Sequence, residues 1–82
     1  MADVRDNPDK SRYEIYEDGE LAGFAVYELT DKLVIFTHTE VDPKFEGHGV
    51  GGALARFALD DVRRTGTHQV LPLCPFIKGW IG

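Results

Sequence analysis

Three runs with the composition of β-strands occupy the first half of the chain, and the first of them alternates polar and apolar residues. They cover residues 12–17, 21–30 and 33–41, and β-branched and aromatic residues dominate the last run. Alternation with a period of two is typical of half-buried strands. Asp18-Gly19 and Asp31-Lys32 separate the runs, and Asp-Gly is a strong hairpin signal. The pattern predicts an antiparallel meander of three strands.

The second half of the chain changes to a helical period. Between residues 50 and 65 the apolar residues gather on one broad face, and charged residues lie opposite. Gly66 suits the position after a helix end, and residues 70–73 form a short apolar run that predicts a strand. A strand, a helix and a strand in this order predict a right-handed crossover. We therefore expect the strands at 33–41 and 70–73 to be parallel.

The two ends of the chain differ from this central part. Residues 1–11 are polar and contain Asn7-Pro8-Asp9, so we expect a flexible N-terminal arm. At the other end, Cys74-Pro75 begins a short helix with proline at its first position. A single domain over residues 12–82 is expected. Its fold class is α/β (α+β), with a meander, a glycine loop, a crossover helix, a parallel fourth strand and a short C-terminal helix.

Composition and charge narrow the class of protein. Hydrophobic residues make up 43% and charged residues 28% of the chain, which is ordinary for a globular protein. The net charge of −5 disfavours a nucleic-acid partner. The sequence has no apolar run near the ~20 residues of a membrane helix, and no secretory signal. One cysteine permits no internal disulfide. We expect a cytoplasmic protein, a monomer or weak dimer, with no membrane partner.

Metal binding is not expected from the sequence. The residues that could ligate a metal lack the paired short spacings of a zinc site; they are His38, His48, His68 and Cys74.

The most informative segment is the glycine loop, residues 45–52, with four glycines in six residues. No Ser, Thr, Asp or Asn stands at the expected N-cap, so the helix begins with N–H groups that its own side chains leave unsatisfied. An anion could satisfy these groups, aided by the helix dipole. The segment does not match the P-loop pattern, and its Gly-x-Gly-x-x-Gly match follows antiparallel strands. A phosphate-binding loop and a flexible connection are both open.

Three segments in order resemble a known family. Residues 46–51, Glu-Gly-His-Gly-Val-Gly, are similar to the acetyl-CoA signature Gln/Arg-x-x-Gly-x-Gly/Ala of the GNAT N-acetyltransferase superfamily. Together with residues 38–41 and 71–76, they resemble the small single-domain GNAT-like N-acetyltransferase family. The resemblance covers roughly residues 12 to 81. It implies a GNAT core reduced to its cofactor half, which transfers acetyl from acetyl-CoA to an unidentified amine of a small molecule or protein.

The resemblance also implies where coenzyme A is held. The strands at 33–41 and 70–73 would splay, with the pantetheine arm between them and the pyrophosphate on backbone N–H groups. The implied cofactor-binding residues are Val41, Glu46, Gly47, His48, Gly49, Val50 and Gly51.

The sequence departs from the family pattern in two places. Glu46 replaces the usual Gln or Arg, and its carboxylate would repel a pyrophosphate unless it points away. Relatives also continue the last helix beyond the point at which this chain ends, Gly82.

Cys74 is the first candidate catalytic residue. It closes a strand at the ligand-facing end and stands at a helix N-terminus, a setting that lowers a thiol pKa. A thiolate beside a thioester could accept the acetyl group and form a covalent intermediate. The alternative is a small buried hydrophobic residue that walls the thioester pocket.

His38 and Glu40 are the other catalytic candidates. They share one face of their strand because side chains alternate, and Val34 and Phe36 are expected on that same face. Either could take the proton from an incoming ammonium, and a near-neutral pKa favours His38. The alternative is a hydrogen-bonded histidine that holds the loop. Thr39, on the other face, is expected to be structural.

Two other functions fit the sequence. At this length the chain lacks the elements with which larger GNAT enzymes build an acceptor groove, so it could be a non-enzymatic acyl-CoA-binding module. It could also be a protein-interaction domain without a cofactor.

Overall fold

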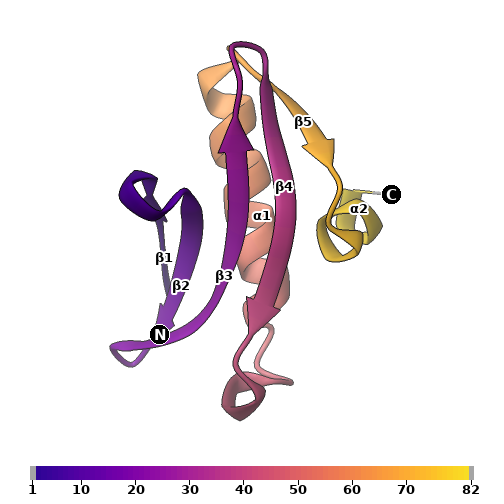
Figure 1. The fold of residues 1–82 in the computed structure, drawn as a ribbon. Coiled ribbons are helices and arrows are strands. Elements are labelled where there is room, and N and C mark those ends of the chain that lie inside the picture. Colours follow the sequence, from indigo (N-terminus) through magenta and orange to yellow (C-terminus); the bar gives the residue numbers. More distant parts are fainter. Residues whose placement is uncertain (1, 82) are drawn as a thin grey trace.

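The protein is a five-stranded sheet with one long helix against one face, and the computed structural model describes residues 2–81 (Figure 1). The elements, in chain order, are β1 (Ala2–Asn7), η1 (Pro8–Lys10), β2 (Arg12–Glu17), β3 (Glu20–Leu29), β4 (Leu33–Val41), η2 (Pro43–Phe45), α1 (Val50–Thr65), β5 (Gln69–Pro72) and α2 (Pro75–Ile81). The strands follow one another across the sheet in sequence order. The strands β1 to β4 pair antiparallel, and β4 pairs with β5 in parallel. The predicted meander, crossover helix, parallel strand and C-terminal helix are confirmed.

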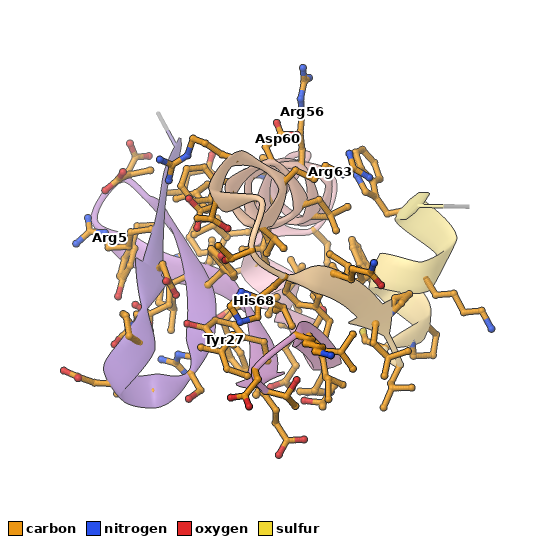
Figure 2. All side chains as sticks on the ribbon, turned by 90° about the horizontal axis from the view of Figure 1, so that it is seen from above. Arg5, Tyr27, Arg56, Asp60, Arg63 and His68 are labelled. Carbon is orange, nitrogen blue, oxygen red and sulfur yellow. The ribbon has the colours of Figure 1, made fainter. Side chains whose placement is uncertain are left out.

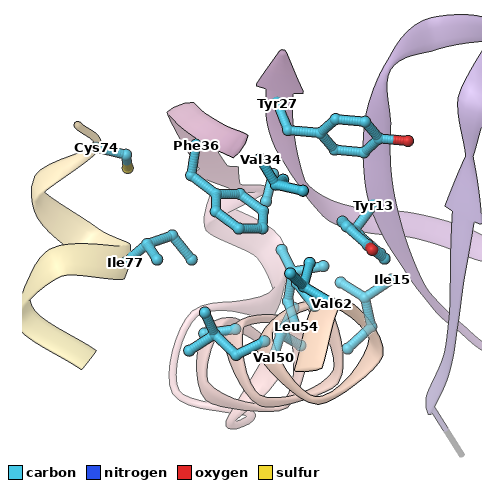
Figure 3. Packing of buried hydrophobic residues seen from close by; sticks show 14 of the residues in the cluster. Tyr13, Ile15, Tyr27, Val34, Phe36, Val50, Leu54, Val62, Cys74 and Ile77 are labelled. Carbon is cyan, nitrogen blue, oxygen red and sulfur yellow. The ribbon is translucent and has the colours of Figure 1, made fainter. Parts of the chain in front are cut away.

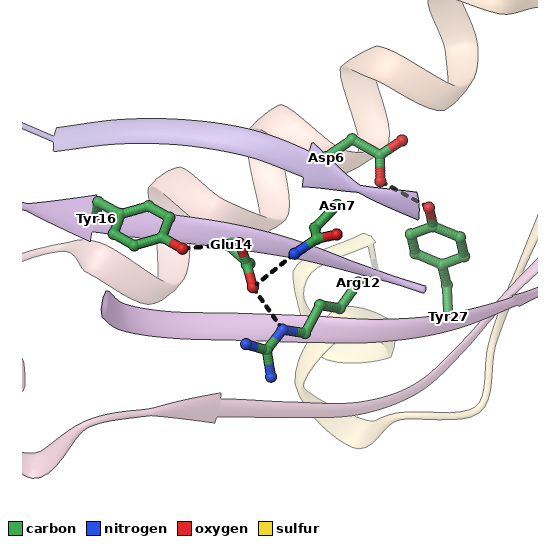
Figure 4. Close-up of polar contacts among 6 residues, drawn as sticks. All are labelled: Asp6, Asn7, Arg12, Glu14, Tyr16 and Tyr27. Atoms are coloured by element: carbon green, nitrogen blue, oxygen red, sulfur yellow. Dashed lines mark hydrogen bonds and ion pairs between the residues drawn. The ribbon is translucent and has the colours of Figure 1, made fainter. Parts of the chain in front are cut away.

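The N-terminal segment differs from the expected flexible arm. Residues 2–7 form the edge strand β1, which pairs with β2 along its whole length. Val4 packs against the core, and the Tyr27 hydroxyl donates a 2.6 Å hydrogen bond to Asp6 Oδ1 (Figure 4). One apolar contact and polar side-chain bonds therefore anchor this strand. The arm was predicted because a polar segment of this kind carries no alternating pattern.

The core lies between α1 and one face of the sheet. Most of the predicted apolar face of α1 is buried, including Val50, Leu54 and Val62. Phe57, which was expected on this face, is 39% exposed, whereas Ala55 and Leu59 are buried. The buried side chains of α1 pack against residues such as Ile15 and Phe36 (Figure 3). Fully burying a side chain of this size stabilises the fold by roughly 1.5–3 kcal/mol. The charged residues on the other side of α1 point away from the sheet (Figure 2): Arg56, Asp60 and Arg63.

The opposite face of the sheet carries a buried carboxylate. Glu14 is only 3% exposed, and its oxygens accept hydrogen bonds from Arg12 Nε at 2.7 Å and from the Tyr16 hydroxyl at 2.9 Å (Figure 4). Asn7 donates a third, longer bond. Burial alone would raise the pKa of Glu14, but these donors outweigh it and lower the pKa. This network joins β1 to β2 on the face that α1 leaves uncovered.

Among the described residues, no helix has the length and apolarity that a membrane span requires.

Candidate active site

The sheet opens between β4 and β5. The two strands pair only from Leu33 to Phe36, with Phe36 opposite Pro72. There the N–H groups of Leu73 and Cys74 both donate to the Phe36 carbonyl, at 3.0 and 2.9 Å, and the chain turns into α2. The strand β4 continues from Thr37 to Val41 beyond the end of this pairing. The divergence that the resemblance implied is therefore present, and one edge of this part of β4 faces the gap.

The glycine loop follows the open end of β4. Gly47 and Gly49 have φ values of +84° and +74°, a backbone region that favours glycine. Gly49 is the N-cap of α1 and supplies no capping side chain. The first helical hydrogen bond runs from the Ala53 N–H to the Gly49 carbonyl at 3.1 Å. The N–H groups of residues 50–52 precede this bond, so the positive end of α1 offers donors to an anion.

Gly51 and Gly52 have a packing role that the sequence did not reveal. A Cβ atom at Gly51 would lie 2.8 Å from Cζ of Phe76, and one at Gly52 would lie 3.5 Å from the Trp80 ring. The absence of a side chain at Gly51 lets α2 approach the first turn of α1. Gly51 therefore has a structural role in packing, and its cofactor-binding role stays a prediction.

The residues around the loop are tied to the β2–β3 hairpin. Lys44 Nζ lies 2.8 Å from Glu20 Oε2, and His48 Nδ1 lies 3.4 Å from Glu17 Oε1. The ring of Phe45, which is buried, meets the His48 ring edge-on. These contacts involve the His48 side chain, and the His48 backbone N–H donates to the Phe45 carbonyl at 3.2 Å, so the amide with the predicted cofactor role already has a partner.

Two further predicted cofactor residues flank the loop. Glu46 is exposed and follows η2. Val41 pairs with Gly23 of β3, and its side chain packs against the core.

Cys74 lies beside Thr39. The thiol is 4% exposed and donates to Thr39 Oγ1 over 3.3 Å. Burial would raise the pKa of Cys74, but the Thr39 hydroxyl, which can turn to donate to the thiolate, and backbone N–H groups at the start of α2 outweigh it. The pKa therefore lies below the ordinary thiol value. Thr39, which the sequence assigned a structural role, is the side chain that contacts the predicted nucleophile.

A β-bulge changes the expected face of His38 and Glu40. On β3, Tyr27 pairs with Phe36 while its neighbour Val26 pairs with His38, so Thr37 is an extra residue in β4. The bulge reverses the alternation. His38 and Glu40 therefore lie on the face away from α1, and the prediction that they share a face with Val34 and Phe36 is wrong. No pattern within one strand reveals such a shift, because it depends on the register with its neighbour.

The predicted catalytic residues therefore lie in two separate pairs and do not form a single group. His38 Nε2 lies 3.5 Å from Glu40 Oε2, and both side chains are more than half exposed. The His38 ring lies 6.3 Å from that of Phe24, centroid to centroid. Cys74 and Thr39 form the second pair on the core side of β4. An amine on the exposed face could use His38 and Glu40, whereas Cys74 meets the gap from the other side.

Comparison with known proteins identifies the family. A sequence profile described as GCN5-related N-acetyl-transferase matches residues 12–82. The chain belongs to this family. A search of curated proteins returned no match.

Solved structures of this GNAT family's fold support the assignment. The chain is similar to a ribosomal-protein-S18-alanine N-acetyltransferase from Escherichia coli, with a TM-score of 0.65 and 21% identity over 72% of this chain. It is also similar to a ribosomal-protein-alanine N-acetyltransferase from Brucella melitensis biovar Abortus 2308, with a TM-score of 0.68 and 18% identity over 78%. A nourseothricin acetyltransferase gives a TM-score of 0.56 and 33% identity over 72%.

The GNAT-like fold here is a truncated one. The chain covers 39%, 50% and 38% of these three proteins.

Between residues 2 and 81, no three His, Cys, Asp or Glu side chains are grouped as metal ligands.

Proposed function

We propose that this GNAT-like chain binds acetyl-CoA in the gap beside β4 and transfers the acetyl group to an amine. The observation that carries the proposal is the parting of β4 from β5 after Phe36, next to a helix N-terminus with no side-chain cap. The gap supplies unpaired strand edge, and the helix end supplies N–H donors for an anion. The two amides of the pantetheine arm need an unpaired strand edge, and the pyrophosphate of coenzyme A needs N–H donors.

The residues present fit the cofactor. The open edge of Thr37–Val41 would pair with the amide groups of the pantetheine arm. The N–H groups of Gly47 and of residues 49–51 would surround the pyrophosphate, whereas the His48 N–H would first have to leave the Phe45 carbonyl. The left-handed conformations at Gly47 and Gly49 shape this loop. Glu46 is exposed, so its carboxylate can turn to solvent and reduce the repulsion. Acetyl-CoA supplies an acetyl group activated as a thioester.

Direct transfer from the exposed face fits the positions of the side chains. His38 or Glu40 would accept the proton of the incoming ammonium. The free amine then attacks the thioester carbonyl carbon, the C–S bond breaks, and coenzyme A leaves as the thiol. Backbone N–H groups at the Thr37 bulge are candidates to stabilise the oxyanion. In this route Cys74 is a wall of the pocket.

A second route uses Cys74 as an acetyl carrier. Its thiolate would attack the carbonyl carbon, release coenzyme A, and pass the acetyl group to the amine in a second step. The lowered pKa of Cys74 and its contact with Thr39 favour this route. Its burial and its separation from His38 by the strand favour direct transfer.

One set of experiments separates these routes. Isothermal calorimetry with acetyl-CoA tests binding, and release of free coenzyme A in the presence of amines tests transfer. Intact mass after incubation with acetyl-CoA shows whether an acetyl adduct forms. Binding with amine-dependent release supports the proposal, and the loss of the adduct in Cys74→Ala together with the loss of transfer selects the second route. Binding without transfer would leave a coenzyme A-binding module.

A further inference from the structure

A hollow on the uncovered face of the sheet lies next to the proposed base. Its volume is about 260 Å³, and its lining residues come from β3 and from the end of β4: Leu21, Ala22, Gly23, Phe24, Glu40, Val41, Asp42 and Pro43. Phe24 and Glu40 are cross-strand partners on the face away from α1. The volume is just below the roughly 300–1,000 Å³ of pockets for drug-sized ligands, so a ligand here must be small.

The backbone explains why the hollow exists. In β3, Ile15 pairs with Gly23 while Tyr16 pairs with Leu21, so Ala22 is an extra residue that bulges. A Cβ atom at Gly23 would lie 2.7 Å from the Glu40 carbonyl oxygen, so glycine is needed for the close approach of β3 and β4 beside the hollow. The Asp42 N–H donates to the Ala22 carbonyl at 2.8 Å and fixes the rim.

The lining combines negative charge with apolar walls. Glu40 and Asp42 contribute carboxylates, while Leu21, Phe24 and Pro43 contribute apolar surface. No residue that lines the hollow is basic.

The cations nearest to the lining residues already have partners. Lys44 pairs with Glu20, and Arg12, whose guanidinium stacks on the Phe24 ring at 4.5 Å, pairs with Glu14. The carboxylates of Glu40 and Asp42 therefore remain for a cation from outside, whereas the Phe24 ring already carries the Arg12 guanidinium and offers apolar contact only.

The hollow is also well placed for transfer. Glu40 lines it and lies 3.5 Å from His38, which stands two residues earlier on the same face, near the point where β4 parts from β5. An ammonium group held by Glu40 could thus reach His38 and the edge of the gap.

We propose that this hollow is the acceptor subsite and takes a small primary amine with a short apolar or aromatic body. The kinetic effects that this inference predicts rest on the proposed acetyl transfer. Binding of an amine in the hollow does not require coenzyme A. The cationic amine lies between Glu40 and Asp42, and its body contacts Phe24 and Leu21.

The first test uses the free protein and 2-phenylethylamine as the probe. In ¹⁵N-resolved NMR titrations the amine is expected to shift the amide signals of residues 21–24 and 40–42. The matched neutral probe, 2-phenylethanol, is expected to shift them much less. Equal shifts for both probes, or shifts of the amine confined to other residues, would overturn the acceptor subsite whether or not coenzyme A binds.

The second test uses kinetics with acetyl-CoA and the same amine. Asp42 Oδ1 accepts a hydrogen bond from the Lys44 backbone N–H. The variant Asp42→Asn keeps an oxygen that can accept this bond, but removes the negative charge. We expect the KM for the amine to rise about fivefold, which corresponds to the loss of one partly exposed ion pair. The kcat and the Kd of acetyl-CoA should not change. Asp31→Asn in the distant β3–β4 turn is the matched control. Equal KM values for both variants would contradict the inference while leaving the proposed function intact.

Discussion

The two halves of β4 have different environments within one strand. From Leu33 to Phe36 the strand has partners on both sides, and Phe36 is fully buried under α1. From Thr37 to Val41 it pairs with β3 only, and the exposed His38 and Glu40 stand on its uncovered face. The boundary is the bulge at Thr37. Pairing on both sides fixes the first half as scaffold, whereas the second half has free backbone groups and side chains for a ligand.

Loss of a core side chain from the paired half should have the largest effect. Phe36→Ala removes a ring with no exposed surface and leaves a cavity, so we expect a loss of about 3–5 kcal/mol in the free energy of unfolding. Urea denaturation measures it. Leu71→Ala, at a residue of β5 that is 38% exposed, serves as the control and should cost clearly less. Equal losses for both would show that the paired half is not the scaffold.

A change in the open half should affect activity and not stability. His38→Ala removes the proposed base from an exposed position, so we expect kcat to fall by about 10²-fold or more. The Kd of acetyl-CoA and the urea midpoint should stay the same. Thr37→Ser, also exposed on β4, is the control with little expected change. An unchanged kcat in His38→Ala would shift the base to Glu40 or remove it from the mechanism.

The N-terminal strand offers a smaller test at the far edge of the sheet. Tyr27→Phe removes the hydroxyl that donates to Asp6, and we expect a loss of about 1–2 kcal/mol. Hydrogen exchange should show faster exchange of the β1 amides, with the β4–β5 amides as the internal reference. Uniform acceleration across the sheet would argue that β1 is not held locally by this bond.

The smallest expected effect concerns the Cys74 thiol. Hydrogen bonds from Thr39 help to lower its pKa, so thiolate should form at a lower pH than in a free cysteine. Thr39→Val removes the hydroxyl, which should move the pH midpoint of alkylation by iodoacetamide upward. Thr37→Val on the same strand is the control. A midpoint that does not move, or moves downward, would contradict the role assigned to Thr39.

Local patterns predicted most of the fold. The β-branched and aromatic residues of 33–41 and the helical period of residues 50–65 predicted those elements with the bounds that the structure shows. The strand β1 was missed because its polar segment is held by partners distant in sequence, such as Tyr27. The gap was implied by the resemblance to the GNAT-like family, and the glycine loop is visible in the sequence itself.

The face of His38 and the partner of Cys74 could not be predicted. Both depend on the register between β3 and β4, and the extra residue at Thr37 is set by pairing across strands. The tight contact between Gly51 and Phe76 depends likewise on how α2 docks. Such tertiary placement leaves no periodic signal within one element.

A ¹⁵N-resolved NMR titration of the full chain with coenzyme A is the most direct test of the central claim. We predict saturable shifts concentrated in the open half of β4, residues 37–41, in the glycine loop, residues 46–52, and at Cys74. The amides of β1 and of Leu33–Phe36 should move little. No shifts at millimolar coenzyme A, or shifts outside the gap and the glycine loop, would contradict the account.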